Sequence, residues 1–171
     1  MLDRFGFRLN VGMVIVNHLG QVLWARRVRH NTWQFPQGGL KEDESEEEAL
    51  YRELYEETGL NSKDVYVMQT SRKHYCYKVP KHMHVSKANK QYQGQKQRWF
   101  LLSLNDEDSD LTLRFNCSKH PEFDSWRWVS YWYPIRHVVP FKRDVYRQML
   151  TEFAPAALRL SLKATPRIQH H

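Results

Sequence analysis

Three glutamates in the segment 38–60 have the spacing that a metal site on a helix requires. Glu56 and Glu57 follow Glu53 by three and four positions, which brings the three carboxylates onto one face of an α-helix. Like charges this close destabilise a bare helix by roughly a few tenths of a kcal/mol per pair. A hard divalent cation such as Mg²⁺ or Mn²⁺ prefers oxygen ligands and would offset that repulsion. The spacing therefore indicates metal-assisted chemistry on a phosphate chain.

The helix that carries these glutamates has clear start and stop signals. Ser45 followed by Glu48 is a capping box, which predicts a helix that begins at Glu46. Gly59 suits the left-handed residue that ends a helix, so the same helix is expected to stop at Thr58. The predicted helix over 46–58 would hold the carboxylates in a fixed arrangement.

Arg52 is placed to orient a neighbouring carboxylate, and Gly38 lets the backbone approach a metal or phosphate closely. A solvated acidic helix is the alternative interpretation of so Glu-rich a stretch. The spacing favours the metal site, because the pattern G-x5-E-x7-R-E-U-x-E-E-x-G-U, with U apolar, runs from Gly38 to Leu60 without a mismatch. By this pattern the chain resembles the Nudix hydrolases, which cleave diphosphate linkages in nucleoside compounds with divalent metal.

The charge distribution points to a long polyanionic substrate. The net charge is +7, but residues 42–57 hold nine of the 19 acids and one of the 26 bases. The remainder therefore has 25 bases and ten acids, a charge of +15. An acidic centre inside a basic body favours a substrate longer than a free nucleotide, although a basic surface can also be merely solubilising.

Length and apolar patterning bound the architecture. The 171 residues suit one domain, here placed at 1–160, with a tail at 161–171 that has no pattern and is expected to be disordered. No apolar run is long enough to span a bilayer, and the start lacks a secretory signal, so a cytoplasmic protein without a membrane partner is expected. The two cysteines show no disulfide framework.

The coarse element pattern is a mixture of short strands and two helices. Alternation and turn residues predict strands at 10–16, 21–25, 65–70, 99–104 and 126–129, with another short strand ending at Leu113. A second helix is expected over 141–153. The segment 72–98 interleaves basic residues with Tyr75, Tyr77 and Tyr92, which indicates single-stranded nucleic-acid binding or, equally, a solvated loop.

Outside the glutamate pattern, longer strings resemble the bacterial RNA 5′-pyrophosphohydrolase branch of the family, whose members were also described as dinucleoside polyphosphate hydrolases. The strings are YRELYEETGL, GQVLWARR, WQFPQGG, GQKQRWFLL, PEFDSWRWVSYWYP and VPFKRDVYR. They all lie within residues 8–153. The resemblance implies an α+β protein with the Nudix αβα arrangement, a mixed β-sheet sandwiched between helices.

The resemblance also implies roles for particular residues. It implies that four carboxylates bind metal, those of Glu53, Glu56, Glu57 and Glu122, and that the backbone at Gly38 lies close to the metal. It implies contacts to the 5′ phosphates from Arg8, Gln37, Tyr77 and Gln95. Arg27 and Phe141 would sandwich a base near the 5′ end, with Lys142 on the RNA backbone. By itself Glu122 is also compatible with a plain surface carboxylate, and Phe141 with a core residue of a helix.

The implied reaction is the conversion of 5′-di- or triphosphorylated RNA to 5′-monophosphorylated RNA, which initiates mRNA decay. Two or three Mg²⁺ ions, or Mn²⁺ in their place, would assist, with Arg52 supporting the catalytic carboxylates. Either Glu53 or Glu57 would be the general base, and the sequence leaves that choice open. Hydrolysis of dinucleoside polyphosphates uses the same metal face and is the alternative activity. An RNA-binding module that has lost catalysis is the alternative outside enzymes, but it would be expected to have a broken pattern.

Overall fold

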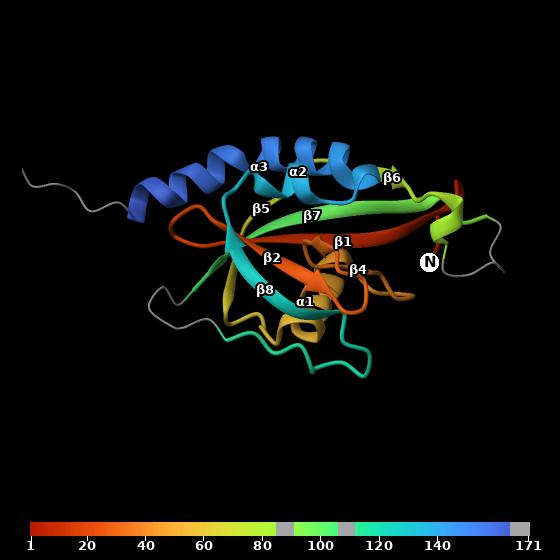
Figure 1. Cartoon of the computed structure of the whole chain (residues 1–171), viewed down its shortest axis with the longest axis horizontal. Coiled ribbons are helices and arrows are strands. Elements are labelled where there is room, and N and C mark those ends of the chain that lie inside the picture. Colours follow the sequence, from red (N-terminus) through yellow and green to blue (C-terminus); the bar gives the residue numbers. More distant parts are fainter. Residues whose placement is uncertain (85–90, 106–111, 165–171) are drawn as a thin grey trace, which may run out of the picture.

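The computed structural model describes residues 1–84, 91–105 and 112–164, which form one mixed β-sheet between helices (Figure 1). The strands are β1 (Phe7–Val16), β2 (Val22–Arg27), β3 (Trp33–Gln34), β4 (Gln37–Gly39), β5 (Val65–Thr70), β6 (Tyr75–Lys78), β7 (Gly94–Leu104) and β8 (Phe123–Val129). The helices are α1 (Glu46–Thr58), α2 (Tyr133–His137) and α3 (Arg143–Ala164), with 3₁₀ turns at Lys81–Met83 and Pro140–Lys142. The predicted α+β, αβα fold is confirmed.

The sheet is built around β1, which pairs with β7 in parallel along its whole length. The other pairings are antiparallel, and the main strand order is β3-β2-β1-β7-β5. Within the described residues, β4 pairs with Asn10–Gly12 near the start of β1, whereas β2 pairs with Val16 at its end. The chain between β3 and β4 therefore crosses to a different part of the sheet and delivers Gln37 and Gly38 beside α1.

Helix α1 begins and ends at the residues that the sequence predicts. The Ser45 side chain accepts a hydrogen bond from the Glu48 backbone N–H, and Gly59 has a left-handed backbone with φ of 77°. Leu50 and Leu54 are fully buried against the sheet. They pack with Val11, Met13 and Ile15 of β1, alternate residues whose side chains point to the same face of the sheet. This cluster, the lower core, fixes the helix against the sheet.

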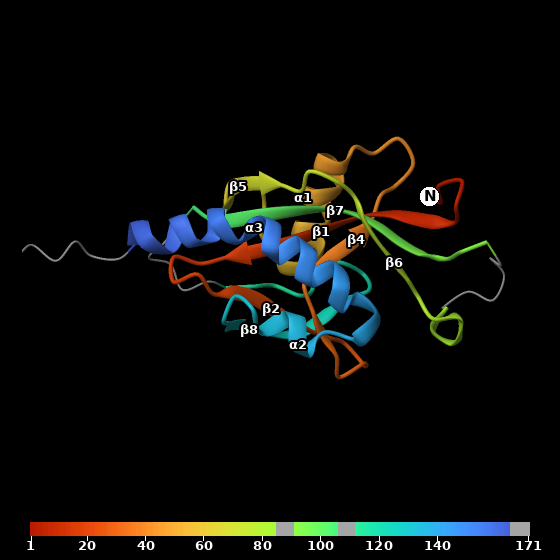
Figure 2. The same ribbon diagram turned by 90° about the horizontal axis from the view of Figure 1, so that it is seen from above.

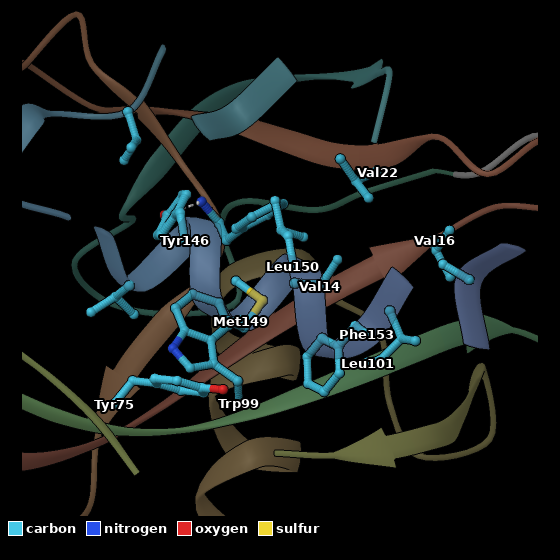
Figure 3. Close-up of a cluster of buried hydrophobic side chains, with 14 of the residues drawn as sticks. Val14, Val16, Val22, Tyr75, Trp99, Leu101, Tyr146, Met149, Leu150 and Phe153 are labelled. Atoms are coloured by element: carbon cyan, nitrogen blue, oxygen red, sulfur yellow. Dashed lines mark hydrogen bonds between the residues drawn. The ribbon is translucent and has the colours of Figure 1, made fainter. Parts of the chain in front are cut away.

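The opposite face of the sheet carries an upper core under α3. Figures 1 and 2 show α3 lying across the sheet on the side away from α1, and Figure 3 shows the side chains between them. Tyr146, Met149 and Phe153 of α3 are at most 1% exposed and pack against Trp99 and neighbouring strand residues. The Tyr146 hydroxyl accepts a hydrogen bond from the Phe35 backbone N–H at 3.0 Å. This contact fixes the segment that leads into β4.

Two expectations about the elements are wrong. The second helix does not stop at residue 153: α3 continues through Pro155 to Ala164, because Ala156 and Ala157 still pack on the upper core. Of the predicted tail at 161–171, residues 165–171 lie outside the described residues. Residues 112–114 form no strand, so the short strand expected to end at Leu113 is absent there.

The prediction of an irregular segment over 72–98 is wrong for two of its parts. Tyr75–Lys78 is strand β6, and β7 begins at Gly94, five residues before the predicted start. The middle of the segment, residues 85–90, lies outside the described residues. Within the part of the chain that the structure describes, no helix is long and apolar enough to cross a membrane.

Candidate active site

The predicted metal ligands of α1, Glu53, Glu56 and Glu57, share one face of the helix but differ in burial. Glu57 is 7% exposed, the Glu53 side chain 13% and the Glu56 side chain 35%. Glu57 is therefore deepest, where the helix approaches β4, and Glu56 lies closest to solvent. Burial of this kind is costly for carboxylates unless a cation or hydrogen-bond donors compensate the charge.

Arg52 compensates part of the acidic cluster. Its guanidinium donates to both carboxylate oxygens of Glu44 at 2.7 and 2.8 Å and to the Gly39 carbonyl at 2.8 Å. It also donates to Glu53 at 2.7 Å and to Glu56 at 3.3 Å. Arg52 is thus tied to the loop before α1 and to two of the three glutamates, and it fixes the orientation of Glu53.

The ion pair between Arg52 and Glu44 makes the stability of the protein sensitive to acid. Hydrogen bonding to Arg52 holds the pKa of Glu44 at about 2, far below the ordinary 4.5. Stability from this ionised carboxylate is fully present above pH 4.5 and is lost as the pH falls toward about 2. We expect the difference in unfolding free energy between wild type and Glu44→Gln to be constant near neutrality and to shrink below pH 4.5. Urea unfolding of both proteins from pH 7 to pH 3 measures it, and a difference independent of pH would contradict the assignment.

Glu57 lacks such compensation. Burial is the main cause that raises the pKa of its carboxyl group well above the ordinary value, and the negative charges of Glu53 and Glu122 raise it further. A hydrogen bond from the Gln37 backbone N–H opposes the shift. The pKa of Glu53 is also raised, mainly by burial, although Arg52 acts to lower it. The Glu57 Oε2 atom is buried and has no hydrogen-bond partner among residues 1–84, 91–105 and 112–164.

The carboxylates are gathered but not arranged as a ready coordination shell. Among residues 1–84, 91–105 and 112–164, no group of three or more His, Cys, Asp or Glu side chains is disposed so that it could hold a metal ion. The contacts of Arg52 explain this, because its guanidinium engages both Glu53 and Glu56. A cation would have to draw the carboxylates together.

Gly38 leaves the space that the Glu53 carboxylate occupies. A Cβ at position 38 would lie 1.9 Å from the carboxyl carbon of Glu53, so Gly38→Ala has to displace that carboxylate. Because misplacing a catalytic group by about 1 Å costs about 10²-fold in rate, we expect kcat to fall by about that factor with the fold intact. Steady-state kinetics and circular dichroism measure the two effects.

Gly39→Ala is the matched control for this prediction. A Cβ there would lie 2.7 Å from Nε of Arg8, an exposed side chain that can move away, and not against Glu53. The control is expected to change KM more than kcat. Equal losses of kcat in both variants would show that the effect comes from the turn and not from Glu53.

Predicted phosphate contacts form a row across three strands. Arg8 of β1 and Tyr77 of β6 both pair with Gln95 of β7, so the three side chains neighbour one another on one face of the sheet. Gln95 donates from Nε2 to the Tyr92 hydroxyl at 2.9 Å, while its buried Oε1 has no hydrogen-bond partner within the described part of the chain. Arg8 is exposed and Tyr77 is buried, so the row runs from solvent inward.

The predicted stacking of RNA bases on tyrosines 75 and 77 is not supported. Tyr75 is buried and its hydroxyl donates to Glu152 at 2.7 Å, and Tyr77 is buried with its ring 5.8 Å from that of Phe141. Both rings belong to the upper core. Tyr92 is half-buried against the edge of His84.

A buried polar network, which the sequence did not reveal, joins Gln37 to the core. Gln37 donates to the Tyr77 hydroxyl at 3.1 Å and accepts from Gln97 at 3.3 Å and from Lys142 at 3.4 Å. Gln97 is fully buried and also donates to Asn10 at 2.8 Å. Polar residues at inward-facing positions of apolar strands were the available signal, because buried amides persist only where their hydrogen bonds are made.

Lys142 belongs to this buried polar network and is not a surface cation. It is 7% exposed and its ammonium donates to Gln34 Oε1 at 2.8 Å. Burial, with the nearby positive charge of Arg27, lowers its pKa to about 8, although Glu122 and Glu57 act in the other direction. The predicted contact with an RNA backbone would therefore be made by a buried ammonium group and not by an exposed one.

Arg27 and Glu122 are held together at the edge of the site. Arg27 Nε donates to Glu122 Oε1 at 3.1 Å, and both side chains are about one-third exposed, at 33% and 40%. Glu122 is close enough to Glu57 to raise its pKa, and Arg27 is close enough to affect Lys142. The side chains predicted to bind metal, phosphates and a base therefore converge on one region.

An αβα sandwich with an acidic helix facing basic and amide side chains defines the class of protein. Residues 6–149 match the NUDIX domain family, so the chain belongs to the Nudix family. It is similar to the RNA pyrophosphohydrolase of Shewanella denitrificans, at 53% identity over 98% of this chain and 96% of that protein. It is likewise similar to the RNA pyrophosphohydrolase of Shewanella loihica, at 54% identity over 92% and 90%.

Solved structures share the fold at low identity. The E. coli dihydroneopterin triphosphate pyrophosphohydrolase has a TM-score of 0.63 and 18% identity, over 85% of this chain and 98% of that one. A C. elegans Ap4A hydrolase in a binary complex has a TM-score of 0.57 and 19% identity, over the same shares. At these identities the likeness concerns the fold alone.

Proposed function

We propose that this protein is an RNA pyrophosphohydrolase, which removes phosphate or pyrophosphate from 5′-di- or triphosphorylated RNA and leaves a 5′ monophosphate. The observation that carries the proposal is the 53% identity over nearly the full length of a protein with that name. The intact glutamate pattern and the charge of +15 outside residues 42–57 support it. Its product would open transcripts to decay, and we expect it to act on RNA in the cytoplasm.

The donor set fits a divalent cation. Glu57 has a buried oxygen without a hydrogen-bond partner among the described residues, and burial raises the pKa of its carboxyl group well above the ordinary value. Glu53 and Glu56 share its helix face, and Glu122 acts on its pKa. These four carboxylates, with the backbone at Gly38, would hold Mg²⁺ or Mn²⁺. When bound, such a cation stabilises phosphate charge and lowers the pKa of a coordinated water.

The chain's own residues would position the reactants. Arg52 anchors Glu53 through a 2.7 Å hydrogen bond, and Glu53 or Glu57 would accept the proton of the attacking water. Arg8 offers a positive charge to the terminal phosphates from the solvent side of the row. A half-turn of the Gln95 amide would aim its NH₂ group where the unpartnered Oε1 now lies, so that it could donate to a phosphate.

A base near the 5′ end would lie between Arg27 and Phe141. Both residues border the pair formed by Tyr77 and Lys142, since the Phe141 ring contacts Tyr77 and Arg27 acts on Lys142. Stacking on an aromatic ring contributes ~1–3 kcal/mol per base and tolerates any base. Releasing Arg27 from Glu122 would free the guanidinium to stack and the carboxylate to bind metal.

A competition assay tests the proposal. Short 5′-triphosphorylated and 5′-diphosphorylated RNAs are compared with diadenosine tetraphosphate, each with Mg²⁺, for kcat/KM and products. We expect the RNAs to be preferred and to yield 5′-monophosphate ends. A tenfold preference for the dinucleotide would replace the proposal with dinucleoside polyphosphate hydrolysis. RNA binding without a metal-dependent product would indicate an inactive binding module.

A further inference from the structure

A recess lies next to the candidate active site, on the far side of Arg27 and Glu122. It has a volume of about 870 Å³ and lies between the loop after β2 and the loop before β8. Its walls include charged and flat side chains, notably Arg29, His30, Arg114, Phe115, Lys119 and His120. Pockets that bind small ligands have volumes of about 300–1,000 Å³, so the recess is large enough for part of a nucleotide chain.

Among the residues that the structure describes, the recess has more positive charge than its acidic side chains compensate. Its two acids are neutralised, because Glu122 pairs with Arg27 at 3.1 Å and Asp124 pairs with Arg26 at 2.8 Å. Arg29, Arg114 and Lys119 are exposed, and none forms an ion pair with any residue in 1–84, 91–105 or 112–164. Such a concave set of cations attracts an anion with several phosphates.

Backbone hydrogen bonds hold the walls of the recess in register with the site. The Val28 N–H donates to the Glu122 carbonyl at 2.8 Å, which joins the two loops to one another. The Arg114 N–H donates to the Thr58 carbonyl at 2.8 Å, which joins the second loop to the end of α1. The loop after β2 also holds Arg29 at a positive φ of 69°, a backbone conformation that is unfavourable for a side chain with a Cβ. The cations are therefore presented from anchored segments that begin beside Glu57 and Glu122.

We propose that this recess binds the phosphodiester backbone of the RNA substrate downstream of the nucleotide held at Arg27. Arg29, Arg114 and Lys119 contact phosphates there, while the acidic helix handles the 5′ end. This inference rests on the proposed function. It predicts that substrate length matters, because only an RNA of several nucleotides reaches from the carboxylates past Glu122 into the recess.

The test compares RNA lengths in a charge-reversed variant. Arg29→Glu with Lys119→Glu alters two exposed side chains that form no ion pair within the described part of the chain, so the fold is expected to persist. Single-stranded nucleic acid shows a salt slope of about 0.7 per phosphate contact, so loss of two contacts lowers the slope by about 1.4. The same relation gives about a tenfold loss of affinity at 0.15 M salt. We expect kcat/KM for a triphosphorylated eight-nucleotide RNA to fall about tenfold relative to a triphosphorylated two-nucleotide RNA.

A control with the same change in net charge separates contact from long-range attraction. Lys63→Glu with Arg159→Glu reverses two exposed charges outside the recess. It is expected to leave the ratio between the two RNA lengths as in wild type. An unchanged ratio in the recess variant, or an equal change in the control, would overturn the inference while leaving the proposed function intact. Failure of the wild-type protein to convert either RNA, with cleavage of diadenosine tetraphosphate, would overturn the proposed function and this inference with it.

Discussion

Glu57→Gln is expected to lower kcat by about 10³-fold while leaving the metal-free protein at least as stable as wild type. The loss is at the upper end of what removal of one electrostatically stabilising group costs an enzyme. The stability follows from the site, because the buried Glu57 carboxyl group has an unpartnered oxygen and a raised pKa. Turnover of triphosphorylated RNA with saturating Mg²⁺ and thermal unfolding without metal measure the two effects.

The stability effect of this change has a definite pH dependence. A carboxyl group whose pKa is raised in the folded state destabilises that state once the pH exceeds its unfolded value, near 4.5. Removing the ionisable group at Glu57 removes this cost, so the stability gain over metal-free wild type is expected to grow from pH 5 to pH 8. Added Mg²⁺ is expected to raise the Tm of wild type more than that of the variant, since it offsets the same buried charge.

Glu47→Gln is the matched control, since Glu47 lies on the same helix and is exposed. It is expected to leave kcat and the Mg²⁺-dependent shift in Tm as in wild type. Near-normal turnover by Glu57→Gln would remove Glu57 from the catalytic machinery. A marked fall in its metal-free Tm would instead show that Glu57 is a structural carboxylate.

Arg52→Gln is expected to have the second largest effect, on stability as well as rate. The Arg52 side chain is 19% exposed and that of Glu44 is 11%, so this ion pair is shielded from water, unlike a surface salt bridge. Removing one partner of a shielded pair leaves the other uncompensated, and we expect a loss of about 3 kcal/mol. For a chain of this size that lowers the Tm by about 6–12 °C. Because Glu53 loses its anchor, kcat is expected to fall about 10²-fold.

A double variant separates these two roles. Removing both partners of a buried interaction costs less than removing one, so Glu44→Gln combined with Arg52→Gln is expected to regain part of the lost Tm. The low kcat is expected to persist, because Glu53 remains without its 2.7 Å hydrogen bond to Arg52. Recovery of kcat together with Tm would show that Arg52 supports the fold alone and does not position Glu53.

Local signals predicted the catalytic helix to the residue. Ser45 and Gly59 act on the backbone within one turn of themselves, so the limits of α1 needed no information from elsewhere in the chain. The same holds for the shared face of Glu53, Glu56 and Glu57, which follows from helical periodicity. Strand β5 was also predicted with its observed limits, because its run of β-favouring residues is bounded by turn residues.

Local signals failed where packing decides the outcome. Strand β6 is too short and too polar at alternate positions to be recognised, and it exists because it pairs with β7. Helix α3 outlasts its predicted end at 153 because Ala156 and Ala157 find a core to pack against. Tyr75 is compatible with a stacking platform in the sequence, but the upper core buries it beside Glu152.

The sequence by itself determined the family, the fold class and the helix that carries Glu53, Glu56 and Glu57, and it predicted which side chains face a polyphosphate. Those features depend on residue types at short spacing, which the chain specifies without folding. The tertiary structure alone decided that burial raises the pKa of Glu57 and that Lys142 is enclosed among buried polar side chains. It also decided that Arg27 closes on Glu122 at the mouth of a basic recess. Burial and the pairing of distant charges depend on which strands become neighbours, and the strands become neighbours only when the whole chain has folded.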